Sequence, residues 1–149
     1  MMQIQKSIES DPIDFSVGKV GPTHLAVEYS DGNSIEWISA GPENGNLSDG
    51  IGSTGNNIRS TDAPSKNSYY GRVSPPAGQT VDQYWATLKQ ASSTYPGNVD
   101  YDTFPALSNS YNSNSFVAGI VSATGGNTTL NFSNFVGGSK PLPPANFGY

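Results

Sequence analysis

The chain has 149 residues, the size of a single domain. Hydrophobic residues make up 34% of it and charged residues only 13%, a composition unlike that of helical bundles, which are rich in Ala, Glu, Lys and Leu. Low charge and 11% aromatic residues also argue against full disorder. Because the sequence contains no cysteine, it excludes disulfides, zinc–thiolate sites and a thiol nucleophile.

The net charge of −5 arises from 7 basic and 12 acidic residues, and the basic residues form no cluster, so we expect no nucleic-acid partner. No apolar run approaches the roughly 18 residues of a membrane span. The first residues also lack the apolar segment of a signal peptide. With one histidine and scattered acidic residues, the sequence predicts neither a metal site nor another cofactor.

The first clear element is a β-hairpin. Residues 1 to about 20 show no clear periodicity, and we expect 1–17 to form a peripheral extension. Residues 23–29 alternate between apolar and polar and predict a strand. A turn at 30–33 contains Asp-Gly, which supplies the positive φ that hairpin turns need, and 34–40 forms the returning strand.

The middle of the chain combines a long polar segment with a helix. Residues 41–67 predict a loop, which would be either a functional lid or an insertion. A short strand follows at 69–73. Thr80 and Gln83 have the spacing of a capping box, and the apolar face that follows predicts a helix to about residue 93.

The last third predicts a second helix, preceded by a connector at 98–107. Phe116, Val117, Ile120 and Val121 share one helical face, and the polar residues before them are candidate N-caps. The glycines at 125–126 end this helix. We expect 137–149 to be a peripheral extension that is extended and largely on the surface.

Two places in the sequence could carry chemistry. One is His24, near the start of the first predicted strand, and the other is the polar segment 112–116 at the start of the second helix. A helix N-terminus has free amide groups and partial positive charge, which lower the pKa of a nucleophile and stabilise an oxyanion. A histidine from a neighbouring strand would then serve as the general base.

The segment 111–117, Tyr-Asn-Ser-Asn-Ser-Phe-Val, resembles the Asn-Cys-Asn-Ser-Phe helix start of circularly permuted papain-like hydrolases. That group includes permuted relatives of the NlpC cell-wall peptidases, the lecithin:retinol acyltransferase-like proteins and the PPPDE deubiquitinase-like peptidases. In those families the histidine precedes the cysteine and lies on a strand, and residues 21–29, which contain His24, are similar to that strand. The resemblance covers about residues 18–126.

The sequence departs from this family at the nucleophile, because Ser113 occupies the cysteine position. Three explanations remain open: a deliberate Cys→Ser replacement that disarms a harmful enzyme, a natural serine enzyme, and a non-catalytic binding member. A hydroxyl cannot be ionised as a thiol can, since a thiol pKa of about 8.5 falls further beside an imidazolium. We therefore expect this chain to bind a substrate but to turn it over slowly or not at all.

The resemblance also implies a polar residue that orients the imidazole from the strand next to the histidine. The candidates are Glu36 and Ser39, and the length of the hairpin turn decides between them. A two- or four-residue turn places Ser39 on the histidine side, whereas a three-residue turn or a bulge places Glu36 there. We predict Glu36, because a carboxylate stabilises imidazolium better, with Glu28, further along the histidine strand, as the second choice.

The sequence thus predicts a single α+β domain over residues 1–149, with a permuted papain-like core in which an antiparallel sheet packs against the nucleophile-bearing helix. The site would comprise Ser113 in the nucleophile position, His24 as general base and Glu36 as its orienter, with Tyr111 and Asn112 contacting the substrate. The implied reaction is attack on an amide or ester carbonyl through an acyl-enzyme.

The biological setting rests on the resemblance. Compact Gly-, Ser- and Asn-rich domains of this kind resemble the toxin ends of bacterial secreted effectors, which implies delivery without a classical signal peptide and an immunity protein as partner. Peptidoglycan peptides are the favoured substrate, with a host protein, a glutamine side chain or a lipid ester as alternatives. Two non-enzymatic alternatives are a binding domain on the same fold and a glycan-binding β-sandwich, and the latter requires 81–93 and 113–123 not to be helices.

Overall fold

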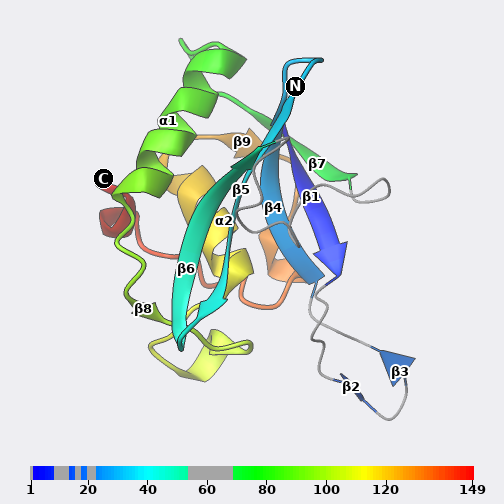
Figure 1. Ribbon diagram of the computed structural model, residues 1–149, viewed down its shortest axis with the longest axis vertical. Coiled ribbons are helices and arrows are strands. Elements are labelled where there is room, and N and C mark those ends of the chain that lie inside the picture. Colours follow the sequence, from blue (N-terminus) through cyan, green and yellow to red (C-terminus); the bar gives the residue numbers. More distant parts are fainter. Residues whose placement is uncertain (1, 9–13, 16–17, 20–22, 54–68) are drawn as a thin grey trace.

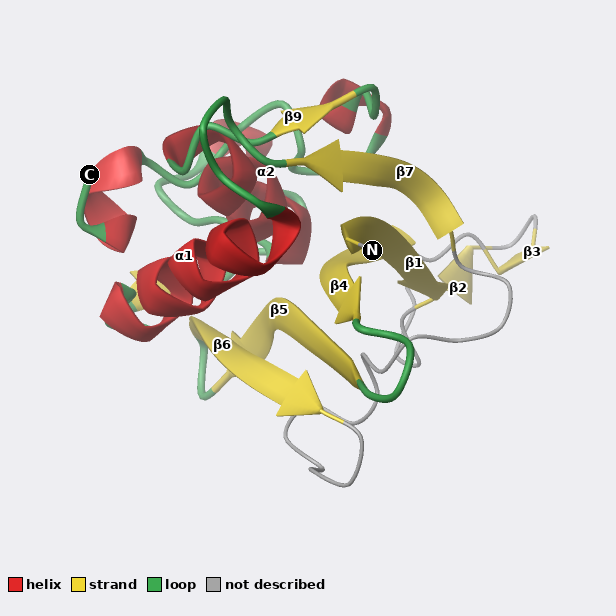
Figure 2. Cartoon of the chain, turned by 90° about the horizontal axis from the view of Figure 1, so that it is seen from above, coloured by secondary structure: helices red, strands yellow, loops and turns green. Residues whose placement is uncertain are grey.

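The computed structural model describes residues 2–8, 14–15, 18–19, 23–53 and 69–149. The described part is an α+β structure in which a curved antiparallel sheet partly surrounds two α-helices (Figures 1 and 2). The strand order is β8-β6-β5-β4-β1-β7-β9. Its strands are β1 (Met2–Ile8), β4 (Thr23–Ser30), β5 (Ile35–Glu43), β6 (Asn46–Ser53), β7 (Tyr69–Ser74), β8 (Val99–Asp100) and β9 (Asn127–Thr128). A separate two-stranded ribbon pairs β2 (Asp14–Phe15) with β3 (Gly18–Lys19).

The predicted hairpin is confirmed as β4 and β5. The pair Ser30↔Ile35 closes it, which leaves a four-residue turn. Gly32 has a φ of 93°, and Asp31 Oδ1 accepts hydrogen bonds from the backbone N of Asn33 and Ser34 at 2.8 and 2.9 Å. These bonds, that from Ser34 first, lower the pKa of Asp31.

Part of the predicted polar loop is instead β-structure. Residues 41–43 extend β5, and residues 46–53 form β6, which pairs with β5 over its whole length. Asn44 and Gly45 both have positive φ, as a two-residue hairpin turn requires. The prediction of a loop was therefore wrong for these residues, and its remainder, 54–68, lies outside the described residues.

Both predicted helices are confirmed. The first, α1 (Val81–Thr94), begins with the predicted capping box, in which Gln83 N donates to Thr80 Oγ1 at 3.1 Å and Thr80 N to Gln83 Oε1 at 2.9 Å. The second, α2 (Ser113–Ala123), has Asn112 as its N-cap, and its residues 113–121 are all buried. The β-sandwich alternative, which excludes these helices, is therefore wrong.

The core lies between the helices and the concave side of the sheet. It is formed by strand residues such as Leu25, Val27 and Ile38 together with Leu88 of α1 and Phe116 of α2. On β4, residues 25, 27 and 29 face this core, so His24, Ala26 and Glu28 belong to the other side of the sheet. Trp37 of β5 is also on that side and covers Gly52, where a Cβ would lie 2.1 Å from the Trp37 ring.

Both segments that we predicted to be peripheral extensions contribute described residues to the main sheet or the core. β1, within predicted extension 1–17, pairs with β4 on one side and β7 on the other. In extension 137–149, Leu142 and Phe147 are buried in the core, and Phe147 lies in the 3-10 helix η4 (Pro144–Phe147). Gly119 of α2 packs so closely on Leu142 that a Cβ there would lie 2.4 Å from the Leu142 carbonyl oxygen.

Candidate active site

The predicted nucleophile segment lies at the start of α2. Asn112 Oδ1 accepts hydrogen bonds from the backbone N of Asn114 and Ser115, each at 3.0 Å, and Ser115 Oγ accepts one from Asn112 N at 3.3 Å. This box satisfies the first amide groups and fixes Ser113 as the first residue of the helix, with only 3% of its surface exposed. Ser113 therefore lies at the positive end of the helix dipole.

The start of α2 also binds the loop that follows β9. Asn112 Nδ2 and Asn114 Nδ2 donate to the carbonyl oxygen of Val136 at 2.8 and 3.0 Å, and Ser115 Oγ donates to that of Gly137 at 3.0 Å. A Cβ at Gly137, whose φ is 84°, would lie 2.1 Å from Asn112 Oδ1, so only glycine fits there. The helix start is thus held by contacts distant in sequence.

A further bond connects the start of α2 to the strand of His24. Asn114 Oδ1 accepts a hydrogen bond of 2.9 Å from the backbone N of Leu25, the residue after His24. The β4–β5 pairing ends at Val27↔Ile38 among the described residues, although β4 still pairs with β1 as far as Thr23 and β5 with β6 as far as Glu43. Asn114 therefore accepts a hydrogen bond from β4 beyond the last residue pair of β4 and β5.

The structure thus brings the segments of His24 and Ser113 together, whereas their side chains start on different sides of the sheet. His24 is 2% exposed and alternates with Leu25, which faces the helices. Ser113 belongs to α2, on the helical side. The two side chains can come into contact only at the part of β4 that is not paired with β5.

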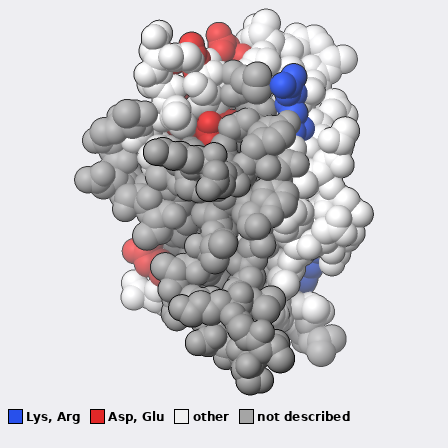
Figure 3. All heavy atoms as spheres, turned by 90° about the vertical axis from the view of Figure 1, so that its right-hand side faces the viewer, with Lys and Arg blue, Asp and Glu red and all other residues white. Residues whose placement is uncertain are grey.

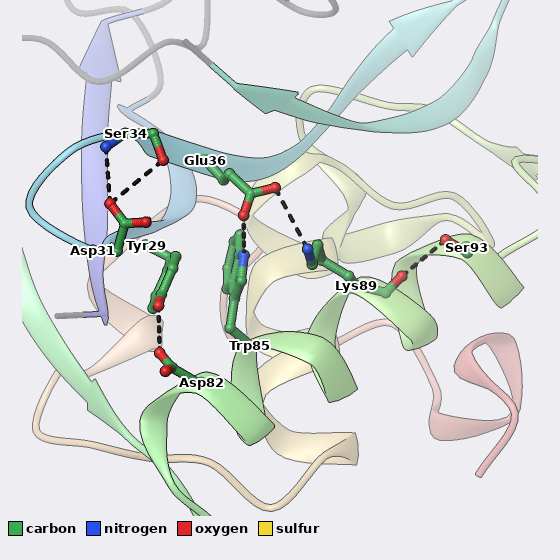
Figure 4. Close-up of polar contacts among 8 residues, drawn as sticks. All are labelled: Tyr29, Asp31, Ser34, Glu36, Asp82, Trp85, Lys89 and Ser93. Atoms are coloured by element: carbon green, nitrogen blue, oxygen red, sulfur yellow. Dashed lines mark hydrogen bonds and ion pairs between the residues drawn. The ribbon is translucent and has the colours of Figure 1, made fainter.

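Glu36, the predicted orienter of His24, is directed elsewhere. Because the hairpin turn has four residues, Glu36 pairs with Tyr29 and lies on the helical side of the sheet. Its carboxylate accepts a hydrogen bond from Trp85 Nε1 at 3.0 Å and forms an ion pair with Lys89 at 3.5 Å, so it points to α1 (Figure 4). The structure does not bring Glu36 to His24, and the choice of Glu36 was wrong for this geometric reason.

The two other candidates lie on the same side of the sheet as His24. Ser39 follows Ile38 on β5 and is fully buried. Glu28 is also buried, but it lies four residues beyond His24, a distance of about 13 Å along a strand. Ser39 is therefore the better-placed of the two.

The two residues predicted to contact the substrate are in contact with other residues of the protein. Asn112 uses its side-chain oxygen for the cap and its nitrogen for the carbonyl oxygens of Thr103, at 3.1 Å, and Val136. Tyr111 is half-buried and forms an isolated β-bridge with Tyr101. The centroid of its ring lies 4.5 Å from Lys140 Nζ. The sequence analysis missed the roles of Asn114 and Lys140. Asn114 bonds a residue 89 positions away and Lys140 bonds residues 30 to 35 positions away, and no local pattern indicates such bonds.

A second polar cluster lies between the hairpin turn and α1. Asp82 accepts a short hydrogen bond from the Tyr29 hydroxyl, and this bond is the main reason why the pKa of Tyr29 is raised to about 12. The Tyr29 ring stacks on Trp85 at 5.4 Å, and an open hollow of about 510 Å³ lies beside it, lined by residues of the turn and the start of α1. Figure 4 shows this cluster on the opposite side of Trp85 from Ser93.

The remaining surface gives little further direction. On the face drawn in Figure 3, the charged side chains of the described residues are scattered, with no large patch of one sign. Within the described parts of the chain, no group of three His, Cys, Asp or Glu residues could hold a metal ion, and neither helix has the length and apolarity to cross a bilayer. Comparisons with protein-family models, curated proteins and solved structures find no match for the chain.

Proposed function

We propose that the start of α2 and the start of β4 form the site of a papain-like hydrolase, with Ser113 in the nucleophile position and His24 as general base. The observation that supports this most directly is the hydrogen bond from Leu25 N to Asn114 Oδ1. It joins the two sequence motifs at the residues next to His24 and Ser113, although they are 89 positions apart. A site of two distant motifs requires that the fold bring their segments together.

The chemistry follows from the helix terminus. The Ser113 oxygen attacks the carbonyl carbon of an amide while its proton passes to His24. The C–N bond then breaks, the amine leaves with that proton, and water hydrolyses the resulting ester. The backbone amide of Ser113, at the N-terminus of α2, helps to stabilise the oxyanion. A serine here is a weaker nucleophile than a thiol, so binding without rapid turnover is the expected behaviour of this chain.

For the third residue we propose Ser39 in place of Glu36. It lies on the side of the sheet that carries His24, whereas Glu36 bonds Trp85 and Lys89 of α1. A buried hydroxyl can accept a hydrogen bond from one imidazole nitrogen and so fix the ring orientation.

The resemblance to permuted papain-like hydrolases extends the proposal to a substrate class and a biological setting. We propose amide bonds of peptidoglycan peptides as substrate and delivery of the chain as a bacterial effector, countered by an immunity protein. An amidase or deamidase acting on a host protein is the alternative that uses the same chemistry. Incubation of a Ser113→Cys variant with purified cell-wall fragments, followed by mass analysis of released peptides, separates the two.

One observation supports a non-catalytic alternative. Only 2% of His24 and 3% of Ser113 is exposed, and a substrate must reach both. In that alternative Ser113 is native and the start of α2 is only a structural junction. It predicts that a thiol at this position gains no special reactivity.

The test is the alkylation rate of a Ser113→Cys variant as a function of pH, with and without His24→Ala. The site predicts a thiol that reacts fast below about pH 7 and loses this when His24 is replaced. A Ser122→Cys variant, exposed on the same helix, supplies the ordinary thiol for comparison. Circular dichroism verifies folding, and His24→Gln replaces His24→Ala if the smaller side chain unfolds the protein. A thiol that titrates as the Ser122→Cys thiol does, whatever occupies position 24, contradicts the proposal.

A further inference from the structure

Two large apolar side chains are exposed on the loops that meet the start of α2. Phe104 is 46% and Val136 38% exposed. Among the described residues the other large hydrophobic side chain with this much exposure is Tyr149. Single exposed apolar residues are common, but two on loops that converge on one site call for an explanation.

One side chain fastens both loops. Asn112 Nδ2 donates to the carbonyl oxygen of Thr103, the residue before Phe104, at 3.1 Å, and to the carbonyl oxygen of Val136 itself at 2.8 Å. The backbones that carry the two apolar side chains are therefore both within reach of a single amide nitrogen. That amide belongs to the residue immediately before Ser113.

The loop of Phe104 is also held on both sides. Before it, Asp102 Oδ1 accepts a hydrogen bond from Phe104 N at 2.9 Å. After it, Lys140 Nζ donates to the carbonyl oxygens of Pro105 and Ser110, each at 2.9 Å, and to that of Ser108. Phe104 is thus exposed on an anchored backbone, not on a free loop.

The same bonds engage the two charged side chains of this surface. The Lys140 ammonium group is surrounded by three carbonyl oxygens and lies over the Tyr111 ring, so it offers little to an anionic ligand. Asp102 is likewise engaged, by Phe104 N and by the Ser108 hydroxyl. These two charged groups are thus bound by the protein itself, whereas the side chains of Phe104 and Val136 are exposed.

We propose that Phe104 and Val136 form an apolar contact for the substrate beside the attacked carbonyl. This inference rests on the proposed function and narrows its substrate class: the group next to the amide is uncharged and apolar, such as an alkyl or aryl side chain. Both residues determine specificity by removing that group from water, and neither takes part in bond making.

The test uses the Ser113→Cys variant and two alkylating probes, iodoacetamide and N-benzyl iodoacetamide. The ratio of their rates, divided by the ratio for glutathione, measures how strongly the site prefers an apolar group. Phe104→Ser and Val136→Ser should each lower this corrected ratio about five- to tenfold. Tyr149→Ser, which removes an aromatic ring that is even more exposed, at 58%, should leave the ratio unchanged.

The outcomes separate this inference from the function on which it rests. A reactive, His24-dependent thiol whose corrected ratio is the same with and without Phe104 and Val136 overturns the apolar contact and leaves the hydrolase site intact. An ordinary thiol that does not depend on His24 overturns both. A ratio that falls equally in Tyr149→Ser also overturns the contact, because the preference would then be a general property of the surface.

Discussion

The two helices begin with the same kind of cap, but the two caps have different roles. At α1, the side chains of Thr80 and Gln83 accept hydrogen bonds from each other's backbone amide groups and lie on the surface. At α2, the cap of Asn112 and Ser115 is buried, and its side chains also bond Thr103, Val136 and Gly137. The cap of α1 makes only local contacts where the helix begins. The cap of α2 is a junction that also binds segments distant in the sequence. A helix cap can thus be identified from sequence without revealing which of these roles it has.

The largest effect is expected from Asn112→Ala. The substitution removes the cap and leaves the carbonyl oxygens of Thr103 and Val136 without this donor, so the free energy of unfolding should fall by about 3 kcal/mol. Denaturant unfolding measures this. Asn112→Asp keeps the capping oxygen but sets an acceptor against the two carbonyl oxygens, so it should also be less stable than the unchanged chain. A loss of under about 1 kcal/mol for Asn112→Ala would mean that the junction is no stronger than a local cap.

A smaller effect is expected from the matching change in α1. Thr80→Ala removes one local bond at an exposed helix start and should reduce the free energy of unfolding by about 1 kcal/mol. Thr80→Ser keeps the bond and serves as the control, with a stability close to that of the unchanged chain. If Thr80→Ala is as damaging as Asn112→Ala in the same denaturant series, the distinction between a local cap and a junction is wrong.

The smallest effect concerns Asp82, in the first turn of α1. Its hydrogen bond is the main cause of the raised pKa of Tyr29, about 12 against 10.0, so Asp82→Asn should lower that pKa toward 10.0. In the folded protein Tyr29 keeps its proton more tightly than in the unfolded chain, so its contribution to stability is complete below pH 10.0 and is lost as the pH rises to about 12.

Tyrosinate absorbance during an alkaline titration measures this change, with Tyr29→Phe identifying which transition belongs to Tyr29. Tyr95, whose pKa burial raises to about 12, stays in both variants as an internal reference. An unchanged Tyr29 transition in Asp82→Asn would show that the surroundings of the α1 start, and not the bond to Asp82, hold the proton.

Local signals in the sequence were sufficient for much of the fold. The Asp-Gly turn, the alternation of β4, the capping box of α1 and the polar start of α2 each predicted the element that the structure contains. One local signal was missed: Asn44-Gly45, a two-residue hairpin turn, lies inside the segment that we predicted to be a loop. The rest of β6 is polar and rich in glycine, and its pairing with β5 and the Trp37 ring over Gly52 override its weak strand propensity.

Long-range structure could not be predicted in the same way. Leu142 and Phe147 are single apolar residues among prolines and polar residues, so no periodicity marks them as core. The face on which Glu36 lies depended on one residue of turn length, which the sequence leaves open. Asn114 looked like part of a helix start, and only the fold shows its bond to Leu25. The two motifs of the candidate site could thus be identified from sequence, whereas the bond that joins their segments and the direction of Glu36 could not.

The position of β1 between β4 and β7 has a consequence for how the chain folds. Its two partners end 22 and 66 residues after β1 ends, and the core behind them is completed by Leu142 and Phe147. Contacts of such sequence separation slow folding, because the loops must close before the contacts form. During synthesis, the first strand thus leaves the ribosome long before the residues that enclose the core, and we expect cooperative folding only once the segment around residue 147 is free.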